Sequence, residues 1–108
     1  MMTTYEEKFQ FLIDKGLDRL SIYRTLGYTA KAFDDEYWRI RQEAYRALGW
    51  NEKAFDDQHC EIKREAYQAL GWNEKALDDD DWDIRREAKN YFKAKKLLEN
   101  EFGKEDKL

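Results

Sequence analysis

Three consecutive segments of this chain repeat one another with little change, and this feature constrains the fold more than any other. The segments start at residues 26, 48 and 70 and read LGYTAKAFDDEYWRIRQEAYRA, LGWNEKAFDDQHCEIKREAYQA and LGWNEKALDDDDWDIRREAKNY. Their glycines, Gly27, Gly49 and Gly71, lie 22 residues apart, so no insertion interrupts the register. A fixed period of this length predicts a solenoid, in which each unit buries its apolar side against its neighbours.

Within each unit, the order of residues predicts a short helical turn, a loop and a longer helix. In the middle copy, Asn51 can cap the turn EKAF, as can Thr29 and Asn73 in the other copies, and paired acids precede the main helix. The predicted core stripe follows helical spacing in each copy. It comprises Ile40, Ala44, Ala47 and Leu48, then Ile62, Ala66, Ala69 and Leu70, then Ile84, Ala88, Tyr91 and Phe92. We therefore expect an all-α fold, a right-handed α-solenoid of three 22-residue helix–turn–helix repeats over residues 26–91.

Aromatic residues at fixed places in the repeat are expected to pack. The aromatic after each glycine, Tyr28, Trp50 or Trp72, is predicted to fold back on the last turn of the preceding helix. The four tryptophans are interpreted as packing residues and not as a ligand cage, because each occupies a position that the repeat defines.

The segments on either side of the repeats are expected to close the ends of the solenoid. Thr4 and Glu7 have the spacing of a capping box, and a second helix is predicted from Asp18 to Leu26, so residues 1–25 are interpreted as an N-terminal helical cap. The last copy lacks the Ala-Leu-Gly stop, so its helix is predicted to continue to Gly103 and to form a C-terminal capping helix and tail over residues 92–108. Together, residues 1–108 are predicted to be one helical-repeat domain.

Composition argues against several classes of protein. The formal net charge of −4 argues against general attraction to nucleic acid or to anionic membranes. One cysteine allows no internal disulfide, no apolar run has membrane-spanning length, and the start MMTTYEEKFQ lacks the regions of a signal peptide. We therefore expect a cytoplasmic location and no membrane partner.

The sequence offers little for catalysis. His59 and Cys60 are the one pairing of a histidine with a thiol, but adjacent residues on a helix diverge by about 100°. Calcium at Asp78–Asp81 with Asp83 is an alternative to helix capping, yet the loop glycine and the distal glutamate of an EF-hand are missing. We therefore predict no catalytic residue, no metal and no cofactor, and the protein is not expected to be an enzyme.

The start of the last main helix, Asp79-Asp80-Asp81-Trp82-Asp83-Ile84-Arg85, resembles the signature of HEAT-like and leucine-rich-variant helical repeats. The matching residues in the other copies are Asp35, Trp38, Ile40 and Arg41, and more loosely Asp57, Ile62 and Lys63. The resemblance covers residues 26–92, although the chain has no proline and its unit is short for these families. It implies a scaffold that binds proteins and occasionally nucleic acids, and some members attach to enzymes.

Polar positions that differ between copies are the candidate binding surface. We expect these positions to face solvent and to bind a partner protein. They are Arg39, Gln42, Arg46, Glu61, Arg64, Gln68, Asp83, Arg86 and Asn90. The basic cluster Lys89, Lys93, Lys95 and Lys96 is interpreted as a solvated face, so direct nucleic-acid binding is not expected. The function predicted first is a non-enzymatic protein–protein interaction module, a small inhibitor or adaptor.

Acidic residues at the turn of each unit suggest an alternative. If the units stack, these residues form an acidic ridge that resembles a phosphate backbone in charge. The ridge comprises Asp34, Asp35, Glu36, Asp56, Asp57, Asp78, Asp79, Asp80 and Asp81. Capping accounts for one aspartate per unit and leaves the others without a local role. The alternative function is therefore an acidic mimic that blocks the basic surface of a nucleic-acid-binding protein, and a second alternative is an accessory subunit of an enzyme.

Overall fold

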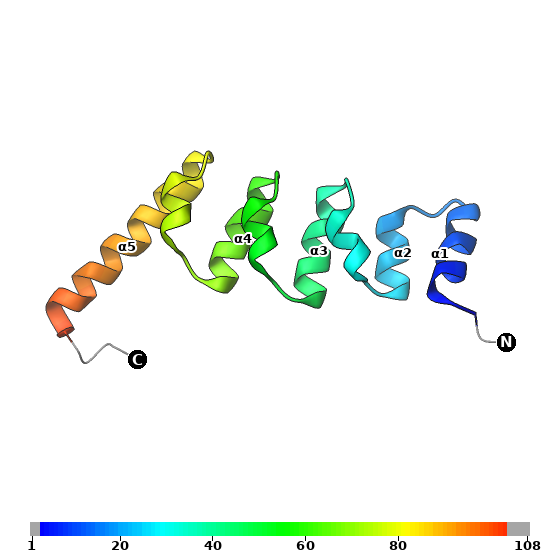
Figure 1. The fold of residues 1–108 in the computed structure, drawn as a ribbon, viewed down its shortest axis with the longest axis horizontal. Helices are drawn as coiled ribbons and strands as arrows, with labels where there is room; N and C mark the ends of the chain where they lie inside the picture. The colour runs from blue at the N-terminus through cyan, green and yellow to red at the C-terminus, as the bar shows by residue number, and fades with distance from the viewer. Residues whose placement is uncertain (1–2, 104–108) are drawn as a thin grey trace. The chain divides into compact units, whose positions relative to one another are not determined.

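The computed structural model describes residues 3–103, and all regular secondary structure in that range is helical. Figure 1 shows the five α-helices, and three short 3₁₀-helices lie between them. The elements are α1 (Tyr5–Asp14), α2 (Arg19–Leu26), η1 (Ala30–Asp34), α3 (Trp38–Leu48), η2 (Glu52–Asp56), α4 (Cys60–Leu70), η3 (Glu74–Asp78) and α5 (Trp82–Phe102). The predicted all-α class is therefore confirmed, while the solenoid arrangement stays a prediction.

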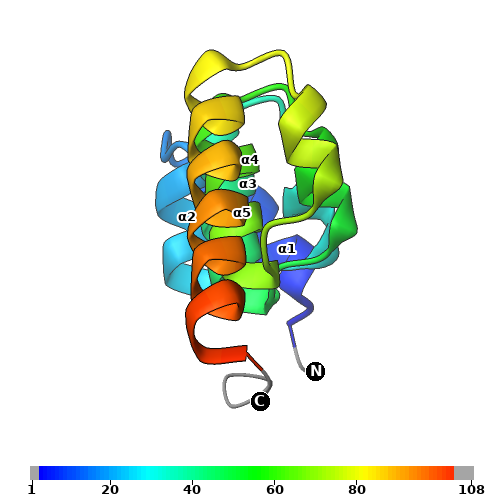
Figure 2. The same ribbon diagram turned by 90° about the vertical axis from the view of Figure 1, so that its left-hand side faces the viewer.

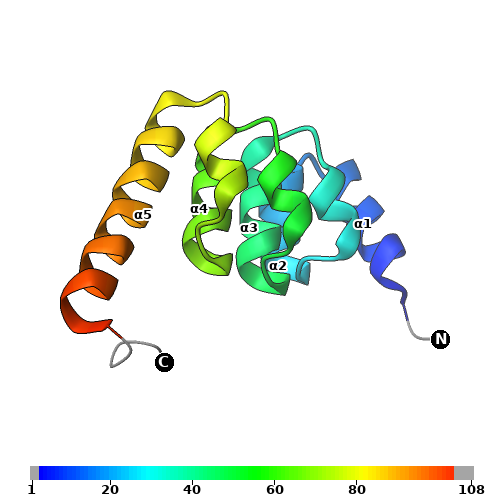
Figure 3. The ribbon, with the colours of Figure 1, turned by 60° about the vertical axis from the view of Figure 1, so that its left-hand side comes forward.

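The helices form two compact units, one ending at Ala54 and the other beginning at Phe55. In the first unit, α2 contacts both α1 and α3, and η1 contacts α3 (Figure 3). In the second unit, η3 lies beside the first part of α5, and a short loop reverses the chain between them (Figure 2). No helix within residues 3–103 is long and apolar enough to cross a membrane.

The two N-terminal helices begin as their sequences predict. The Glu7 N–H donates to Thr4 Oγ1 at 3.1 Å, while the Thr4 N–H donates to Glu7 Oε1 at 3.5 Å, which completes the capping box of α1. Asp18 Oδ1 accepts from the Ser21 N–H at 2.7 Å and caps α2. These local hydrogen bonds fix both helix starts.

Buried aliphatic residues at the start of each main helix confirm the first half of the predicted core stripe. In the first unit, Ile40 and Ala44 are buried together with Tyr23 and Ala32. The equivalent residues Ile62, Ala66, Ile84 and Ala88 are fully buried in the second unit.

The second half of that stripe was predicted wrongly. Ala47, Leu48, Ala69, Leu70 and Tyr91 are exposed, whereas Tyr45 and Tyr67 are buried. In α4, the buried residues are Ile62, Lys63, Ala66 and Tyr67, so the covered face lies in the first two turns and the last turn extends beyond it. Helical periodicity gives the direction of a side chain but not where along the helix its neighbours end.

Three helices end with the same glycine–aromatic arrangement. Gly27, Gly49 and Gly71 have φ values of 103°, 113° and 107°, a region that residues with a Cβ rarely adopt. The following aromatic ring then stacks on a tyrosine of the last turn. The pairs are Tyr23–Tyr28 at 5.4 Å and 8°, Tyr45–Trp50 at 5.2 Å and 7°, and Tyr67–Trp72 at 5.2 Å and 8°. The predicted folding back of the aromatic is confirmed at all three ends.

The short turns predicted in each copy are the 3₁₀-helices, and two of the three predicted caps are present. Asn51 Oδ1 accepts from the Lys53 N–H and Asn73 Oδ1 from the Lys75 N–H, each at 2.9 Å. Thr29 forms no side-chain cap.

Candidate interaction surface

The structure distributes the nine predicted partner-binding residues over both units. In the first unit, Arg39 and Arg46 are exposed, but Gln42 is only 5% exposed. The prediction that this column faces solvent is therefore wrong at Gln42, where a neutral amide is less costly to bury than a charge. In the second unit, the exposed members are Gln68, Arg86 and Asn90, and the half-buried members are Glu61, Arg64 and Asp83.

Three of these residues contact one another in an ion-pair cluster of the second unit. Arg64 lies 3.6 Å from Glu61 Oε1 and 3.5 Å from Asp83 Oδ2, and its Nε lies 3.2 Å from Glu87 Oε2. The Arg64 Nε–Glu87 Oε2 contact is an ion pair without hydrogen-bond geometry. Arg64 therefore links α4 to α5, and its charge is already surrounded by carboxylates.

Trp82 at the start of α5 is the exposed aromatic that sequence reasoning missed. Its side chain is 61% exposed, so the interpretation of Trp82 as a packing residue is wrong. The other three tryptophans, Trp38, Trp50 and Trp72, are half-buried. Trp82 lies two residues before the fully buried Ile84, about 200° around the helix from the core, but Trp38 has the same spacing from the buried Ile40 and is half-buried. Rotation from the core therefore does not by itself distinguish the exposed Trp82 from Trp38.

Contacts with neighbouring side chains hold Trp82 in place at the surface. The Arg86 guanidinium lies 4.5 Å from the centre of the Trp82 ring, and Arg86 Nη2 lies 3.1 Å from Asp83 Oδ1. Exposed residues follow Trp82 at i+4, i+7, i+11 and i+15, on one side of α5. We call this surface the Trp82 face; it consists of Trp82, Arg86, Lys89, Lys93 and Leu97. It combines an aromatic residue, an aliphatic residue and three positive charges.

The acidic residues of the first unit are held by basic side chains. Arg19 donates to Asp35 from Nε at 2.8 Å and from Nη2 at 2.9 Å, and the Tyr37 N–H donates to Asp35 at 2.9 Å. Burial raises the pKa of Asp35, but the hydrogen bonds from Arg19 and Tyr37 outweigh it and bring the pKa below its ordinary value. Asp34 forms an ion pair with Lys53.

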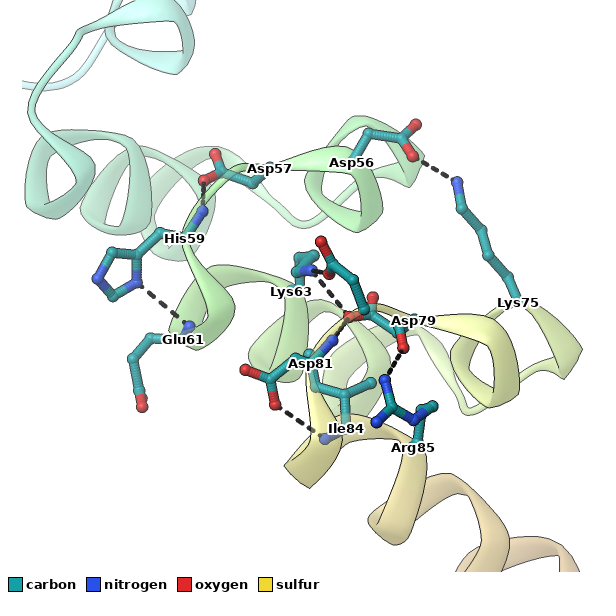
Figure 4. Close-up of polar contacts among 11 residues, drawn as sticks. Asp56, Asp57, His59, Glu61, Lys63, Lys75, Asp79, Asp81, Ile84 and Arg85 are labelled. Atoms are coloured by element: carbon teal, nitrogen blue, oxygen red, sulfur yellow. Dashed lines mark hydrogen bonds and ion pairs between the residues drawn. The ribbon is translucent and has the colours of Figure 1, made fainter.

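The acidic residues of the second unit have similar contacts, drawn in Figure 4. Lys63 Nζ donates to both Asp79 and Asp80 at 2.8 Å, and Lys75 Nζ donates to Asp56 at 2.6 Å. Burial lowers the pKa of the Lys63 amine, yet the two carboxylates more than offset burial and raise the pKa overall. The lysine charge is therefore kept although its side chain is largely covered.

Backbone groups use two further acidic residues of this set. Asp57 accepts from the His59 N–H at 2.8 Å, and Asp81 accepts from the Ile84 N–H at 3.1 Å and so caps α5. Within residues 3–103, the Asp78 side chain forms none of these contacts and is exposed. The expectation that capping leaves the other acidic residues of each unit without a local role is therefore wrong for Asp34 and Asp56, because a lysine 19 residues later pairs with each of them.

His59 and Cys60 lie at the start of α4. His59 Nδ1 accepts from the Glu61 N–H at 3.2 Å, which makes the imidazole the cap of this helix. Cys60 is a free, half-buried thiol. Across residues 3–103, no group of three or more histidine, cysteine or acidic side chains is arranged to hold a metal ion.

Comparison with known proteins gives no match. No protein family, curated protein or solved structure corresponds to this chain. Among the large apolar side chains within residues 3–103, Trp82 is the most exposed, at 61%.

Proposed function

We propose that this protein is a non-enzymatic interaction module and that a partner protein binds the Trp82 face of α5. The observation that carries this proposal is the 61% exposed Trp82 held against Arg86 at 4.5 Å. Tryptophan and arginine are the residue types most enriched among those that dominate binding energy at protein interfaces. A ring that is already fixed also loses little conformational entropy when a partner covers it.

The charges of this face indicate the chemistry of the partner. Arg86, Lys89 and Lys93 are exposed beside Trp82 and Leu97. The matching surface is therefore an apolar pocket with an acidic rim, because unlike charges favour encounter and like charges oppose it. Of the predicted columns, this proposal keeps Arg86 as a partner-binding residue and leaves out Gln42 and Arg64.

We also propose the architecture that presents this face. The three glycine–aromatic ends share one local geometry, with stacked rings at 5.4, 5.2 and 5.2 Å. This recurrence supports a repeat of 22 residues. The proposed arrangement is a right-handed α-solenoid of three such repeats in a single cytoplasmic domain, similar to HEAT-like repeats, with residues 1–25 and 92–108 at its ends. Small-angle scattering that shows two independently oriented units would contradict it.

The test of the interaction module is capture of the partner by the full chain and by a matched pair of variants. Changing Trp82 and Arg86 to Ala removes one apolar side chain and one positive charge from the proposed site. Changing Leu98 and Lys95 to Ala removes the same kinds of group about 160–220° around the helix from Trp82. We expect the affinity of the first variant for a captured protein to fall about 30-fold or more, on the order of 2 kcal/mol or more. The second variant should bind that protein as tightly as the parent chain does.

Two treatments of the captured material separate the other functions. Equal binding by the two variants would move the site away from Trp82, and loss of capture after nuclease treatment would replace a protein partner by a nucleic acid. If the captured protein is an enzyme, its turnover with and without this chain tests the role of an accessory subunit.

The acidic mimic stays a second, weaker proposal. Exposed acidic residues such as Glu36, Asp78 and Asp80 support it, but most members of the acidic set are paired with lysine or arginine, which reduces the field they present. Its test is displacement of labelled DNA from a nucleic-acid-binding partner at low and high salt. Displacement that does not weaken with salt would exclude this proposal.

A further inference from the structure

A cleft of about 680 Å³ lies in the first unit, where α1, α2 and the segment around η1 meet. One wall is aromatic and consists of Tyr5, Phe9 and Tyr23. The Phe9 ring meets Tyr23 edge to face at 5.1 Å, and the Tyr5 and Phe9 rings are 6.1 Å apart. The Tyr5 hydroxyl donates to the Gly27 carbonyl oxygen at 2.6 Å, which fixes the position of its ring. The wall is therefore formed before any ligand arrives.

The Tyr23 hydroxyl is an unused polar group in this cleft. Tyr23 is only 4% exposed and lines the cleft, and within residues 3–103 its hydroxyl has no hydrogen-bond partner. The nearby Tyr28 differs, because its hydroxyl donates to Glu43. The Tyr67 hydroxyl oxygen is fully buried without a partner, whereas the Tyr23 hydroxyl oxygen keeps some solvent exposure, so a ligand N–H can reach it from the cleft.

The charged groups around the cleft favour a cation. Four acidic and two basic side chains line it. Asp35 is bound by Arg19 and Asp34 by Lys53, whereas Glu36 is 90% exposed and lies 3.8 Å from Arg19. Glu6 has no ion pair or hydrogen bond of its side chain within residues 3–103. An aromatic wall beside carboxylates is the arrangement that binds ammonium and guanidinium groups.

We propose that this cleft binds an organic cation, a guanidinium or ammonium group on an aliphatic stem. The stem packs against Phe9, the charge lies near Glu6 and the face of Tyr5, and one N–H donates to the Tyr23 hydroxyl oxygen. The cation belongs either to a lysine or arginine side chain of a peptide or to a free amine, which share this chemistry. This site is distinct from the Trp82 face, so either proposal can fail while the other stands.

The second unit contains a matched control for this site. A cleft of about 440 Å³ there is lined by Lys63, Lys75, Asp78, Asp79 and Asp80, which are equivalent in the repeat to charged residues of the first cleft. Its tyrosine at the position of Tyr23 is Tyr67, whose hydroxyl is covered and does not line the cleft. The second cleft therefore has the charges without an accessible phenol.

The binding test uses the full chain, labelled with ¹⁵N, and three small probes. They are N-acetyl-arginine methylamide, N-acetyl-lysine methylamide and the neutral isostere N-acetyl-citrulline methylamide. We expect the two cations to shift amide signals of residues 5–10 and 19–23, and citrulline to bind about tenfold more weakly because it lacks the charge. Citrulline binding equal to arginine, or no shift with any probe, would overturn the proposal.

Variants then assign the binding to the named groups. Tyr23→Phe, which removes one oxygen, and Glu6→Gln, which removes one exposed charge, should each weaken arginine binding about threefold or more. Tyr67→Phe should leave it unchanged, and equal weakening by Tyr67→Phe and Tyr23→Phe would overturn the site. Circular dichroism confirms that each variant is folded.

A last comparison distinguishes the two sources of the cation. Tighter binding of the peptide acetyl-Gly-Gly-Arg-Gly-Gly-amide than of agmatine assigns the cleft to a peptide side chain, and the reverse order assigns it to a free amine.

Discussion

Helices α4 and α5 start alike and end differently, although each follows a turn that carries paired aspartates. Both bury an isoleucine and an alanine at equivalent positions, Ile62 with Ala66 and Ile84 with Ala88. Yet α4 has 11 residues and α5 has 21. The difference shows that the start of a helix and its end are specified by separate groups of residues in this chain.

Three positions account for the difference. In α4, Tyr67 stacks against Phe55 at 4.5 Å and against Trp72 at 5.2 Å, and Gly71 supplies the positive φ at the helix end. In α5, the equivalents of Tyr67, Gly71 and Trp72 are Lys89, Lys93 and Ala94. None of these can form the stack or the turn, so the helix continues and its later apolar residues stay exposed.

The largest effect is expected from removing the stacked tyrosine. Tyr67→Ala should lower the free energy of unfolding by about 3–5 kcal/mol, because it empties a fully buried site between two rings. Lys89→Ala at the equivalent position of α5 should change it by less than about 0.5 kcal/mol. Urea denaturation of the two variants measures both, and similar losses would contradict the distinction between the helices.

A second prediction concerns acid, and it distinguishes the end of α2 from that of α4. At the end of α2 the aromatic is Tyr28, whose hydroxyl donates to Glu43, and Arg24 Nε donates to the same carboxylate at 2.9 Å. These hydrogen bonds, from Arg24 first and also from Tyr28, lower the pKa of Glu43 to about 2 although burial opposes the shift. Trp72 at the end of α4 has no hydroxyl to form such a contact.

The sign of the pH dependence follows from the lowered pKa. The stabilisation by ionised Glu43 is complete above its ordinary pKa of 4.5 and is lost as the pH falls from there through about 2. Its size is on the order of 2 kcal/mol, since one pKa unit corresponds to about 1.4 kcal/mol and the contact is partly solvated. Urea midpoints between pH 7 and pH 2 should fall less for Glu43→Gln than for the parent chain. An equal fall in both would exclude Glu43 as the source.

Local sequence signals predicted the features that depend on neighbours within a few residues. The capping box of α1, the asparagine caps and the glycine–aromatic ends all involve residues up to five positions apart. The extension of α5 was predicted in the same way, from the missing glycine at Lys93. Each of these follows from backbone geometry that the local sequence alone sets.

Several features that depend on distant residues were not predicted. The pairing of Asp34 with Lys53 joins residues 19 positions apart, and the burial of Gln42 depends on what covers its helix. The exposure of Trp82 was not predicted, because Trp38 has the same place in the repeat and is half-buried. Tyr23 lines the cleft of the first unit. The sequence does not distinguish it from Tyr45 and Tyr67, which have the same place in the repeat.

A third prediction exchanges the residues that end or continue a helix. Gly71→Ala should destabilise the chain by about 1–2 kcal/mol, because φ of 107° is strained for a residue with a Cβ. Lys93→Gly in α5 should cost about 1 kcal/mol through loss of helix propensity, without shortening the helix before that residue. The helical content from circular dichroism and the thermal midpoint measure the two effects, and a neutral Gly71→Ala would remove glycine from the explanation of the helix end.

The smallest effect separates a paired aspartate from an unpaired one. Asp56 accepts from Lys75 at 2.6 Å, whereas the equivalent Asp78 has no such lysine, because Leu97 occupies the position 19 residues after it. Asp56→Asn should therefore cost about 0.2–1 kcal/mol at low salt, the range for exposed ion pairs, and less at 1 M salt. Asp78→Asn should be neutral or slightly stabilising, because it removes one negative charge beside Asp79 and Asp80 without breaking a contact.

Thermal midpoints of both variants at the two salt concentrations give the comparison. If Asp78→Asn lowered the stability as much as Asp56→Asn, the ion pair with Lys75 would not explain the contribution of Asp56.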